Sequence, residues 1–230
     1  MPKMVNKIKK AEMDEMMIRI GDKVKLLFDP AQGGMLIGDS LGLIDKVSIE
    51  VRRPVDRNHM YSQAYKYPNP NISHGSNWLR SKGYLRSKRL GVLPASYDIL
   101  TKIDGLDLAI DFKLIFVDSL PKVEMVKAWF FIKATKCLVE DDKETREFSL
   151  LPATKKFQQV YQGNLNTVTF TNSQGSLQLL SKQSNLLVDD RVLKQRRHAE
   201  YITQWFYDTG FPCIEEGTVF EGSWRLRYSR

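Results

Sequence analysis

The sequence predicts an α+β protein in which an antiparallel sheet packs with a C-terminal helix, preceded by a basic, partly mobile arm. Three observations lead to this prediction. Residues 106–117 alternate between apolar and polar side chains, as a half-buried strand does. Residues 190–209 carry apolar side chains at helical spacing between an acidic cap and a glycine. The excess positive charge gathers in residues 52–89, where neither periodicity holds.

Further strands are predicted on both sides of residues 106–117. Alternation or a short apolar run bounded by turn residues indicates strands at 23–29, 47–51, 148–151, 160–171 and 177–180. Residues 5–20 read as a short helix. Residues 122–139 suit a helix or a strand, and we expect a short helix that runs into a strand. The alternation at 224–228, with arginines pointing outward, predicts the last strand of a closing hairpin.

The C-terminal helix is expected to begin at Asp189 or Asp190 and to end at Gly210. The side chains at helical spacing, which would form its buried stripe, are Val192, Ala199, Ile202 and Phe206. Its outer side forms a secondary basic face of Arg191, Lys194, Arg196 and Arg197.

The composition suits a folded chain. Of its 230 residues, 42% are hydrophobic and 10% are aromatic, which is enough for a sizeable core. The longest uninterrupted apolar run, residues 128–132, is far shorter than the roughly 20 residues that a membrane helix needs. Two cysteines cannot form a disulfide framework, and together with three histidines they show no metal-ligand spacing. We therefore expect a reducing compartment, no metal and no other cofactor.

The net charge of +8 is concentrated in one segment, because residues 52–89 contain nine basic side chains and one acid, Asp56. Interleaved tyrosines and Trp78 could stack on bases, and basic side chains neutralise phosphates. The predicted polyanion-binding residues are Arg52, Arg53, Arg57, Lys66, Arg80, Lys82, Arg86, Lys88 and Arg89. The alternative is a solvated loop whose tyrosines pack locally. The corresponding division of the chain is an N-terminal part (1–53), a basic aromatic-rich arm (54–97) and an α+β core (98–230).

No catalytic motif is recognisable. Glycine-rich phosphate loops and the Gly-x-Ser-x-Gly elbow are absent from the sequence. The best enzyme-like set is Asp111, Glu124 and Lys127, which could hold a metal in a nuclease. A solvated strand edge with a helical ion pair explains the same residues, and we favour that explanation. The sequence therefore predicts that the chain is not an enzyme.

The segment from Trp78 to Tyr97, rich in basic residues and ending in Pro94-Ala-Ser-Tyr97, resembles the N-terminal arm of rhabdovirus matrix proteins. Residues 160–165, the predicted helix ending at Gly210 and residues 214–224 are similar to later elements of that family. Pro94 and Tyr97 form a degenerate version of its budding motif, which has a second proline in many members.

The resemblance implies a virion structural protein that self-assembles beneath the viral envelope. Its expected partners are the viral nucleoprotein-RNA, an anionic membrane surface bound peripherally, and other copies of itself, with no small-molecule substrate. Its expected location is the virion and the host cytoplasm or inner membrane surface, with the host nucleus as a further option. The alternatives are a nucleic-acid-binding capsid or movement protein and, in third place, a metal-dependent nuclease.

Overall fold

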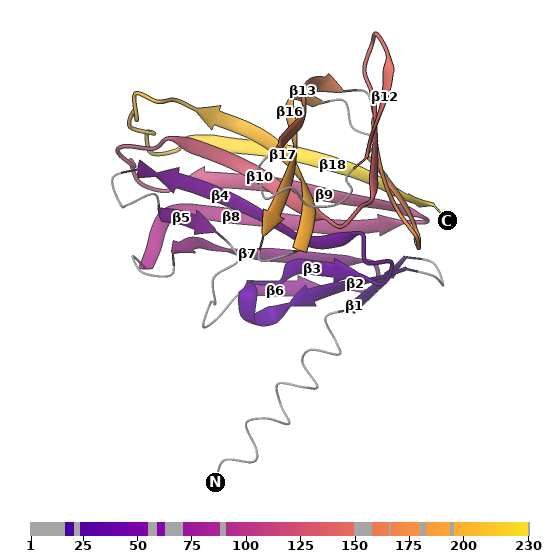
Figure 1. The fold of residues 1–230 in the computed structure, drawn as a ribbon. Coiled ribbons are helices and arrows are strands. Elements are labelled where there is room, and N and C mark those ends of the chain that lie inside the picture. Colours follow the sequence, from indigo (N-terminus) through magenta and orange to yellow (C-terminus); the bar gives the residue numbers. More distant parts are fainter. Residues whose placement is uncertain are drawn as a thin grey trace.

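The described part of the protein is built from strands. A computed structural model describes residues 17–20, 24–54, 59–62, 71–87, 91–149, 158–165, 167–179, 183–193 and 196–229. Three strands form a small sheet in the order β1-β2-β3, and the others form one large antiparallel sheet (Figure 1). One 3-10 turn, Pro30–Gln32, is the only helical element within these ranges. No helix among them is long and apolar enough to cross a membrane.

The strands lie at the following positions. The first half of the chain contributes β1 (Met17–Ile20), β2 (Val24–Asp29), β3 (Met35–Asp39), β4 (Ile44–Arg53), β5 (His59–Ser62), β6 (Asn71–His74), β7 (Trp78–Ser87), β8 (Gly91–Asp104) and β9 (Asp107–Phe116). The second half contributes β10 (Met125–Ile132), β11 (Lys136–Glu140), β12 (Thr145–Ser149), β13 (Gln158–Leu165), β14 (Thr167–Asn172), β15 (Gly175–Leu179), β16 (Gln183–Leu193), β17 (Arg196–Tyr207) and β18 (Val219–Ser229).

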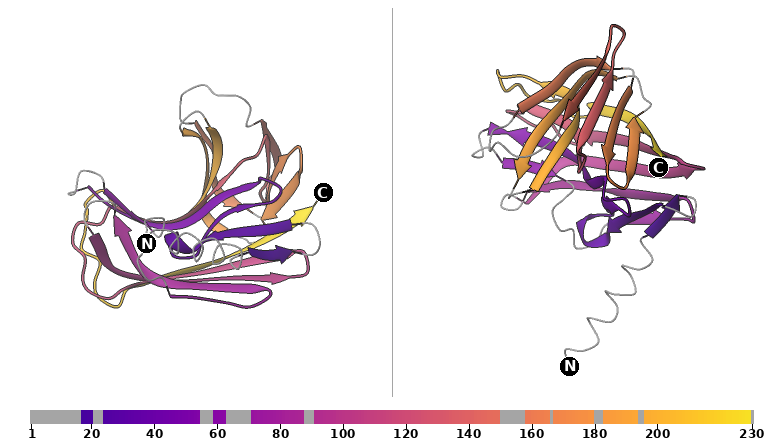
Figure 2. Two further views of the ribbon diagram at one scale, coloured as in Figure 1. Left: turned by 90° about the horizontal axis from the view of Figure 1, so that it is seen from below. Right: turned by 45° about the vertical axis from the view of Figure 1, so that its right-hand side comes forward.

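The large sheet folds back on itself into two layers. Its strand order is β12-β11-β14-β15-β18-β9-β8-β7-β5-β4-β10-β17-β16-β13, with β6 paired to β7 off this path. Strands β18, β9, β8 and β7 form the first layer, and β4, β10 and β17 form the second (Figures 1 and 2). In the left view of Figure 2, β4 bends over the first layer with its concave side turned away from it.

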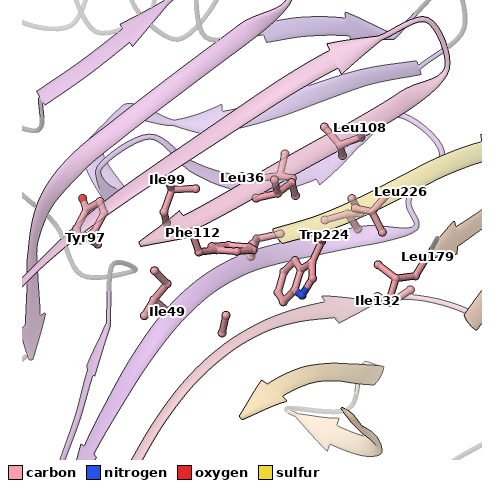
Figure 3. Packing of buried hydrophobic residues seen from close by; sticks show 14 of the residues in the cluster. Leu36, Ile49, Tyr97, Ile99, Leu108, Phe112, Ile132, Leu179, Trp224 and Leu226 are labelled. Carbon is pink, nitrogen blue, oxygen red and sulfur yellow. The ribbon is translucent and has the colours of Figure 1, made fainter. Parts of the chain in front are cut away.

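The core lies between the two layers and follows from strand alternation. Leu108, Ile110 and Phe112 of β9 are buried, as the sequence predicts for residues 106–117. Phe112 packs edge-on against Trp224 of β18, with ring centroids 4.4 Å apart (Figure 3). Ile49 of β4 closes the core from the second layer. Each layer thus contributes one apolar face, which is the arrangement of a β-sandwich.

The predicted C-terminal helix is wrong, because its residues form β16 and β17. These strands pair antiparallel, and β17 also pairs with β10. Ile202 stands opposite Trp129 in the register. The proposed buried stripe includes β-branched and aromatic residues, which favour strands when a neighbouring strand is present. The fold is therefore all-β and not α+β.

The prediction of a basic, partly mobile arm is also wrong. Within residues 54–97 the structure describes strands β5, β6, β7 and the first half of β8, and β8 runs across the predicted boundary at residue 97. The division of the chain into residues 1–53, 54–97 and 98–230 stays a prediction. The strands of all three parts nevertheless join sheets of one fold.

Some of the other predicted strands and helices agree with the structure, and some do not. Strands at 23–29, 47–51 and 177–180 correspond to β2, β4 and β15, and 160–171 spans parts of β13 and β14. The short helix expected within 122–139 is absent there, because that segment forms β10 and β11. The last strand has the expected alternation, but β18 pairs with β9 and β15 and not in a hairpin with β17. Residues 5–16 lie outside the described residues, and 17–20 form β1.

Asp39 joins the small sheet to the large one. It ends β3 and is buried, and its carboxylate accepts hydrogen bonds from the backbone N–H groups of Leu41, Leu43 and Ile44 at 2.8, 3.1 and 2.6 Å. The hydroxyl of Tyr228 in β18 donates a fourth at 3.2 Å. Burial raises the pKa of Asp39, while the four donors act in the opposite direction. The carboxylate therefore fixes the turn that leads into β4.

Replacing Asp39 should destabilise the fold in a graded way. Asp39→Ala leaves three backbone donors without their acceptor, and we expect the free energy of unfolding to fall by at least about 3 kcal/mol. Tyr228→Phe removes one hydrogen bond and should cost about 1 kcal/mol. Urea unfolding measures both, with Asp104→Ala at an exposed position as a control expected to change stability by under about 0.5 kcal/mol. Equal effects of Asp39→Ala and Asp104→Ala would contradict this role.

Candidate functional site

A set of polar and aromatic side chains lies on the side of the second layer that faces away from the core. In β4, Val47, Ile49 and Val51 enter the core, so the alternating positions 46, 48 and 50 turn to the opposite side. In β10 the same alternation turns positions 127, 129 and 131 outward. We call these six residues the β4–β10 face: Lys46, Ser48, Glu50, Lys127, Trp129 and Phe131.

The register of the two strands sets these residues in three rungs. Lys127 stands opposite Glu50, Trp129 opposite Ser48, and Phe131 opposite Lys46. Directly opposed side chains in an antiparallel pair are close enough to interact. One end of the face therefore carries an acid and an ammonium group, and the other end carries a lysine and an aromatic ring.

The aromatic part is a packed pair with a lysine above it. The rings of Trp129 and Phe131 meet edge to face, with centroids 4.3 Å apart, and form a buried cluster separate from the main core. The ammonium of Lys46 lies 5.0 Å from both ring centroids. The Nζ of Lys127 lies 6.0 Å from the Trp129 ring centroid. Both lysines are thus within cation–π distance of the aromatic pair.

The charged part is a buried ion pair. The Nζ of Lys127 lies 3.4 Å from Oε2 of Glu50, and each side chain is only 8% exposed. Taking both charges out of water costs several kcal/mol, and the attraction between them often only restores that loss. A buried pair outside the main core is therefore weak evidence for a stabilising role.

The indole N–H of Trp129 has no acceptor. Within the described part of the chain its Nε1 is buried without a hydrogen-bond partner. Buried donors are almost always paired in native proteins, and each exception asks for an explanation. A ligand that brings an oxygen to this position would supply the missing acceptor.

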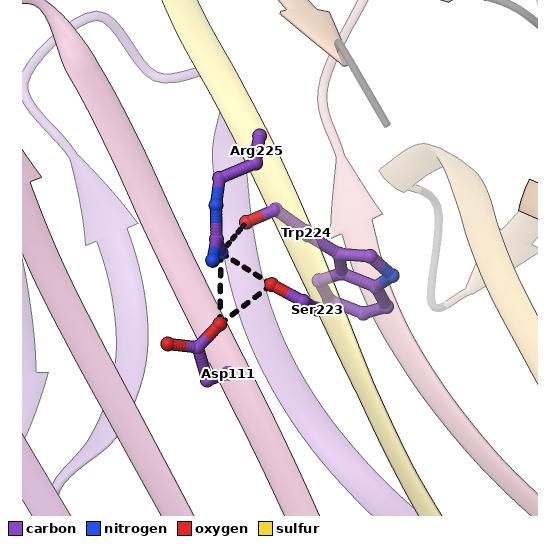
Figure 4. A network of polar contacts seen from close by, with 4 residues as sticks. All are labelled: Asp111, Ser223, Trp224 and Arg225. Atoms are coloured by element: carbon purple, nitrogen blue, oxygen red, sulfur yellow. Dashed lines mark hydrogen bonds and ion pairs between the residues drawn. The ribbon is translucent and has the colours of Figure 1, made fainter. Parts of the chain in front are cut away.

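A second polar region lies on the outer side of the first layer. A groove with a volume of about 570 Å³ is lined by Asp111, Lys113, Ser223 and neighbouring residues of β8 and β18. Arg225 and Ser223 both donate to Asp111, at 2.8 and 2.5 Å (Figure 4). These contacts pair Asp111 with Arg225 at the sheet surface, where solvent screens an ion pair, and we interpret the groove as a solvated sheet surface.

The structure separates the metal-site residues that the sequence suggested. Asp111 lies in the outer groove on β9, whereas Lys127 pairs with Glu50 on the second layer. Glu124 pairs with Arg52 at 2.8 Å. No group of acids, cysteines and histidines that could hold a metal occurs among the described residues. Nothing in this arrangement supports a metal-dependent nuclease.

The predicted polyanion-binding residues that the structure describes have partners in the fold. Arg80 and Lys82 of β7 both bind Asp98 of β8, at 2.6 and 3.0 Å. Arg53 donates to the carbonyl of Pro121 at 3.2 Å. Arg86 lies half-buried on β7, near its bulge. The remaining residues, Arg57, Lys66, Lys88 and Arg89, lie outside the described residues. Polyanion binding by this set stays a prediction.

The other predicted sites are placed only in part. Arg191 belongs to β16 and Arg196 and Arg197 to β17, and Lys194 lies outside the described residues. Pro94 and Tyr97 both lie in β8, and the Tyr97 side chain is buried in the core. The degenerate budding motif is therefore part of a strand.

Most of the β4–β10 face is missing from the sites predicted from sequence. Lys127 is among them only as a candidate for a metal site, and Lys46, Glu50, Trp129 and Phe131 are not among them. One signal could have found the residues of β4: polar residues alternate with apolar residues in Lys46-Val-Ser-Ile-Glu50. The run Ala-Trp-Phe-Phe-Ile in β10 shows no such alternation.

Comparison with known proteins identifies the fold. The chain matches a galactose mutarotase related enzyme from Lactobacillus acidophilus with a TM-score of 0.60 and 9% identity, over 93% of this chain and 97% of that one. It also matches a galactose mutarotase-like protein from Lactobacillus casei, with a TM-score of 0.61, 8% identity and coverage of 93% and 99%. The chain has a mutarotase-like fold.

A third match agrees with the first two. The "Putative aldose 1-epimerase" from Escherichia coli K12 gives a TM-score of 0.53 and 13% identity, over 93% of this chain and 98% of that one. No protein-family model and no curated protein matches the sequence. At these identities the comparisons establish the fold and nothing finer.

These findings overturn the matrix-protein interpretation. The resemblance to rhabdovirus matrix proteins is wrong, because 93% of the chain follows a fold shared with mutarotase-like proteins. The expected viral function, the ribonucleoprotein and membrane partners and the exclusion of a small-molecule substrate fall with it. The expectation that the chain is not an enzyme is contradicted as well, because a structure of the same fold is described as an enzyme.

The ion pair between Arg80 and Asp98 predicts how the stability of the fold depends on pH. Two hydrogen bonds from the Arg80 guanidinium, helped by Lys82, hold the pKa of Asp98 below its ordinary value, although partial burial acts the other way. A lowered folded-state pKa stabilises the fold above the unfolded pKa of about 3.9, and this contribution is lost as the pH falls through the folded value. Asp98→Asn should therefore lose less stability than the wild type between pH 6 and pH 2.5.

Urea unfolding at the two pH values measures that difference. Asp104→Asn, on the same strand but without an ion pair to a described residue, should keep the wild-type pH dependence. If Asp98→Asn and wild type lost the same amount of stability on acidification, the Arg80 contact would not be the source of the effect.

Proposed function

We propose that this protein is a carbohydrate-acting enzyme that interconverts the two anomers of a sugar on the β4–β10 face. One observation carries the proposal: the buried Glu50–Lys127 pair lies one rung from Trp129, which packs on Phe131 and whose indole N–H has no acceptor among the described residues. The mutarotase-like fold supports it, since proteins of that fold include a galactose mutarotase related enzyme. The function stated for those proteins is not transferred on fold alone.

The aromatic pair suits the apolar face of a sugar ring. Pyranoses present C–H groups on one face and hydroxyl groups around the edge, so they pack on aromatic rings while their oxygens seek hydrogen bonds. Trp129 and Phe131 offer the rings, and the Nε1–H of Trp129 offers a donor. Sites of this kind combine an apolar lining with a few well-placed polar groups.

The acid–ammonium pair suits the proton transfers of anomer exchange. In this mechanism the Glu50 carboxylate accepts the proton of the anomeric hydroxyl, and the Lys127 ammonium donates a proton to the ring oxygen. The bond between the anomeric carbon and the ring oxygen breaks and leaves an open-chain aldehyde. The bond between the anomeric carbon and its neighbouring carbon then rotates. Reverse proton transfers close the ring as the other anomer and restore the Glu50 carboxylate and the Lys127 ammonium.

Removing the Glu50 carboxylate, which accepts the proton in this mechanism, should slow anomer exchange without unfolding the protein. Glu50→Gln keeps the size of the side chain but cannot take the proton, so we expect the rate to fall by about 10²- to 10⁴-fold. The rate is measured by NMR or polarimetry on freshly dissolved α-galactose and α-glucose. Glu147→Gln, at an exposed position on β12, is the matched control and should keep the wild-type rate.

Stability must be separated from activity in that experiment, because a lone buried Lys127 would cost about 3–5 kcal/mol. The double variant Glu50→Gln/Lys127→Gln leaves two neutral amides on the same rung, so it should fold and remain inactive. A folded Glu50→Gln variant with wild-type activity would contradict the role of Glu50. A wild-type protein that accelerates exchange of no sugar would contradict the proposed function.

A further inference from the structure

Among the described charged residues near the β4–β10 face, one lysine has no acid as a partner. Lys127 pairs with Glu50 at 3.4 Å, Arg52 with Glu124 at 2.8 Å, and Lys133 with Asp45 at 2.5 Å. Lys46 has no carboxylate within ion-pair distance among the described residues, and its ammonium lies over the two rings instead. Among the described residues, no acid therefore balances the charge of Lys46 at the Phe131 end of the face.

The position of Lys46 leaves its hydrogen-bonding capacity available. An ammonium has three N–H donors, and contact with ring faces holds it by electrostatics without supplying lone-pair acceptors. Its side chain is half-buried, whereas the other five residues of the face are buried. A partly dehydrated cation at the accessible edge of a site is well suited to receive an anion.

We propose that the sugar bound by this site carries an acidic substituent, a phosphate or a carboxylate, which Lys46 binds. This inference rests on the proposed function of the same face. Lys46 and Glu50 lie four residues apart on β4, about 13 Å along the strand, and the Lys46 side chain shortens this distance by leaning over the rings. The acidic group is therefore at the end of the sugar remote from the anomeric carbon, which Glu50 and Lys127 address.

The electrostatics of the face agree with this assignment. A neutral sugar that covers the partly exposed Lys46 ammonium would remove water from this charge without replacing it by an anion, and burying an unpaired charge is costly. An acidic sugar would neutralise that charge as it binds. Selectivity would then come both from the new ion pair and from the penalty on neutral sugars.

The test compares sugars that differ only in charge. Anomer exchange and calorimetric binding are measured for galactose, galacturonate and galactose 6-phosphate with the full-length protein. We expect kcat/KM for at least one acidic sugar to exceed that for galactose by on the order of tenfold to a hundredfold. Two acidic sugars are needed because they distinguish a carboxylate site from a phosphate site.

Variants assign the preference to Lys46. Lys46→Gln should lower the ratio of acidic to neutral kcat/KM by about tenfold or more, and Lys46→Glu should invert the preference. Lys136→Gln, at an exposed ion pair with Glu147, is the control and should leave the ratio unchanged. Raising the salt concentration should weaken the preference in the wild type more than in Lys46→Gln.

The outcomes separate this inference from the proposed function. Exchange of neutral and acidic sugars at equal kcat/KM, unaffected by Lys46→Gln, would overturn the acidic-substrate inference and leave the proposed function standing. Neither exchange nor binding of any of the three sugars would overturn both. Binding of an acidic sugar that Lys46→Gln weakens, without exchange, would support Lys46 as the anion-binding residue and count against the catalytic proposal alone.

Discussion

The pairing register of β4 and β10 is the constraint on which the rest of the site depends. With Val47, Ile49 and Val51 in the core, the intervening side chains must point to the other side of the sheet. A slip of one residue would send Glu50 into the core and expose Val47 and Val51. This slip is unfavourable because it loses the free energy gained by burying apolar surface. The hydrophobic core thus sets the register, and the register brings Glu50 opposite Lys127 and Ser48 opposite Trp129.

The two polar regions of the sandwich show what makes one of them a site. In the outer groove Asp111, Ser223 and Arg225 bind one another across neighbouring strands, and solvent screens their charges. On the β4–β10 face a charge pair and an indole N–H are buried, and no described residue supplies an acceptor for the N–H. Such an arrangement lowers stability relative to an apolar surface, so a function is the better explanation for it.

The wrong predictions from sequence have a common physical cause. Apolar residues in 190–209 recur at intervals that fit a helix, but most of this segment forms β17, which is held as a strand by pairing with β10 on one side and β16 on the other. Likewise, Arg80 and Lys82 read as free positive charge because their acid, Asp98, lies on the next strand. A local sequence pattern contains no information about a pairing strand or an ion-pair partner that lies far away in the sequence. A fold shared with other proteins at 8–13% identity leaves equally little trace in the sequence, and a loose motif resemblance then misleads.

The sequence by itself determined which side chains share a face of a strand, because the period of two is a property of the backbone. Alternation alone was enough to identify β2 and β9 and the inward-facing Trp224, Leu226 and Tyr228 of β18. Only the tertiary structure decided which strands become neighbours. Glu50 and Lys127 meet because the sheet folds back until β4 and β10 pair, and no local pattern in either strand specifies that contact. Of the candidate site, Ser48 and Glu50 were readable as alternating positions of the predicted strand 47–51, whereas residues 122–139 suited a helix or a strand. The assembly of the two strands into one site depends on non-local pairing.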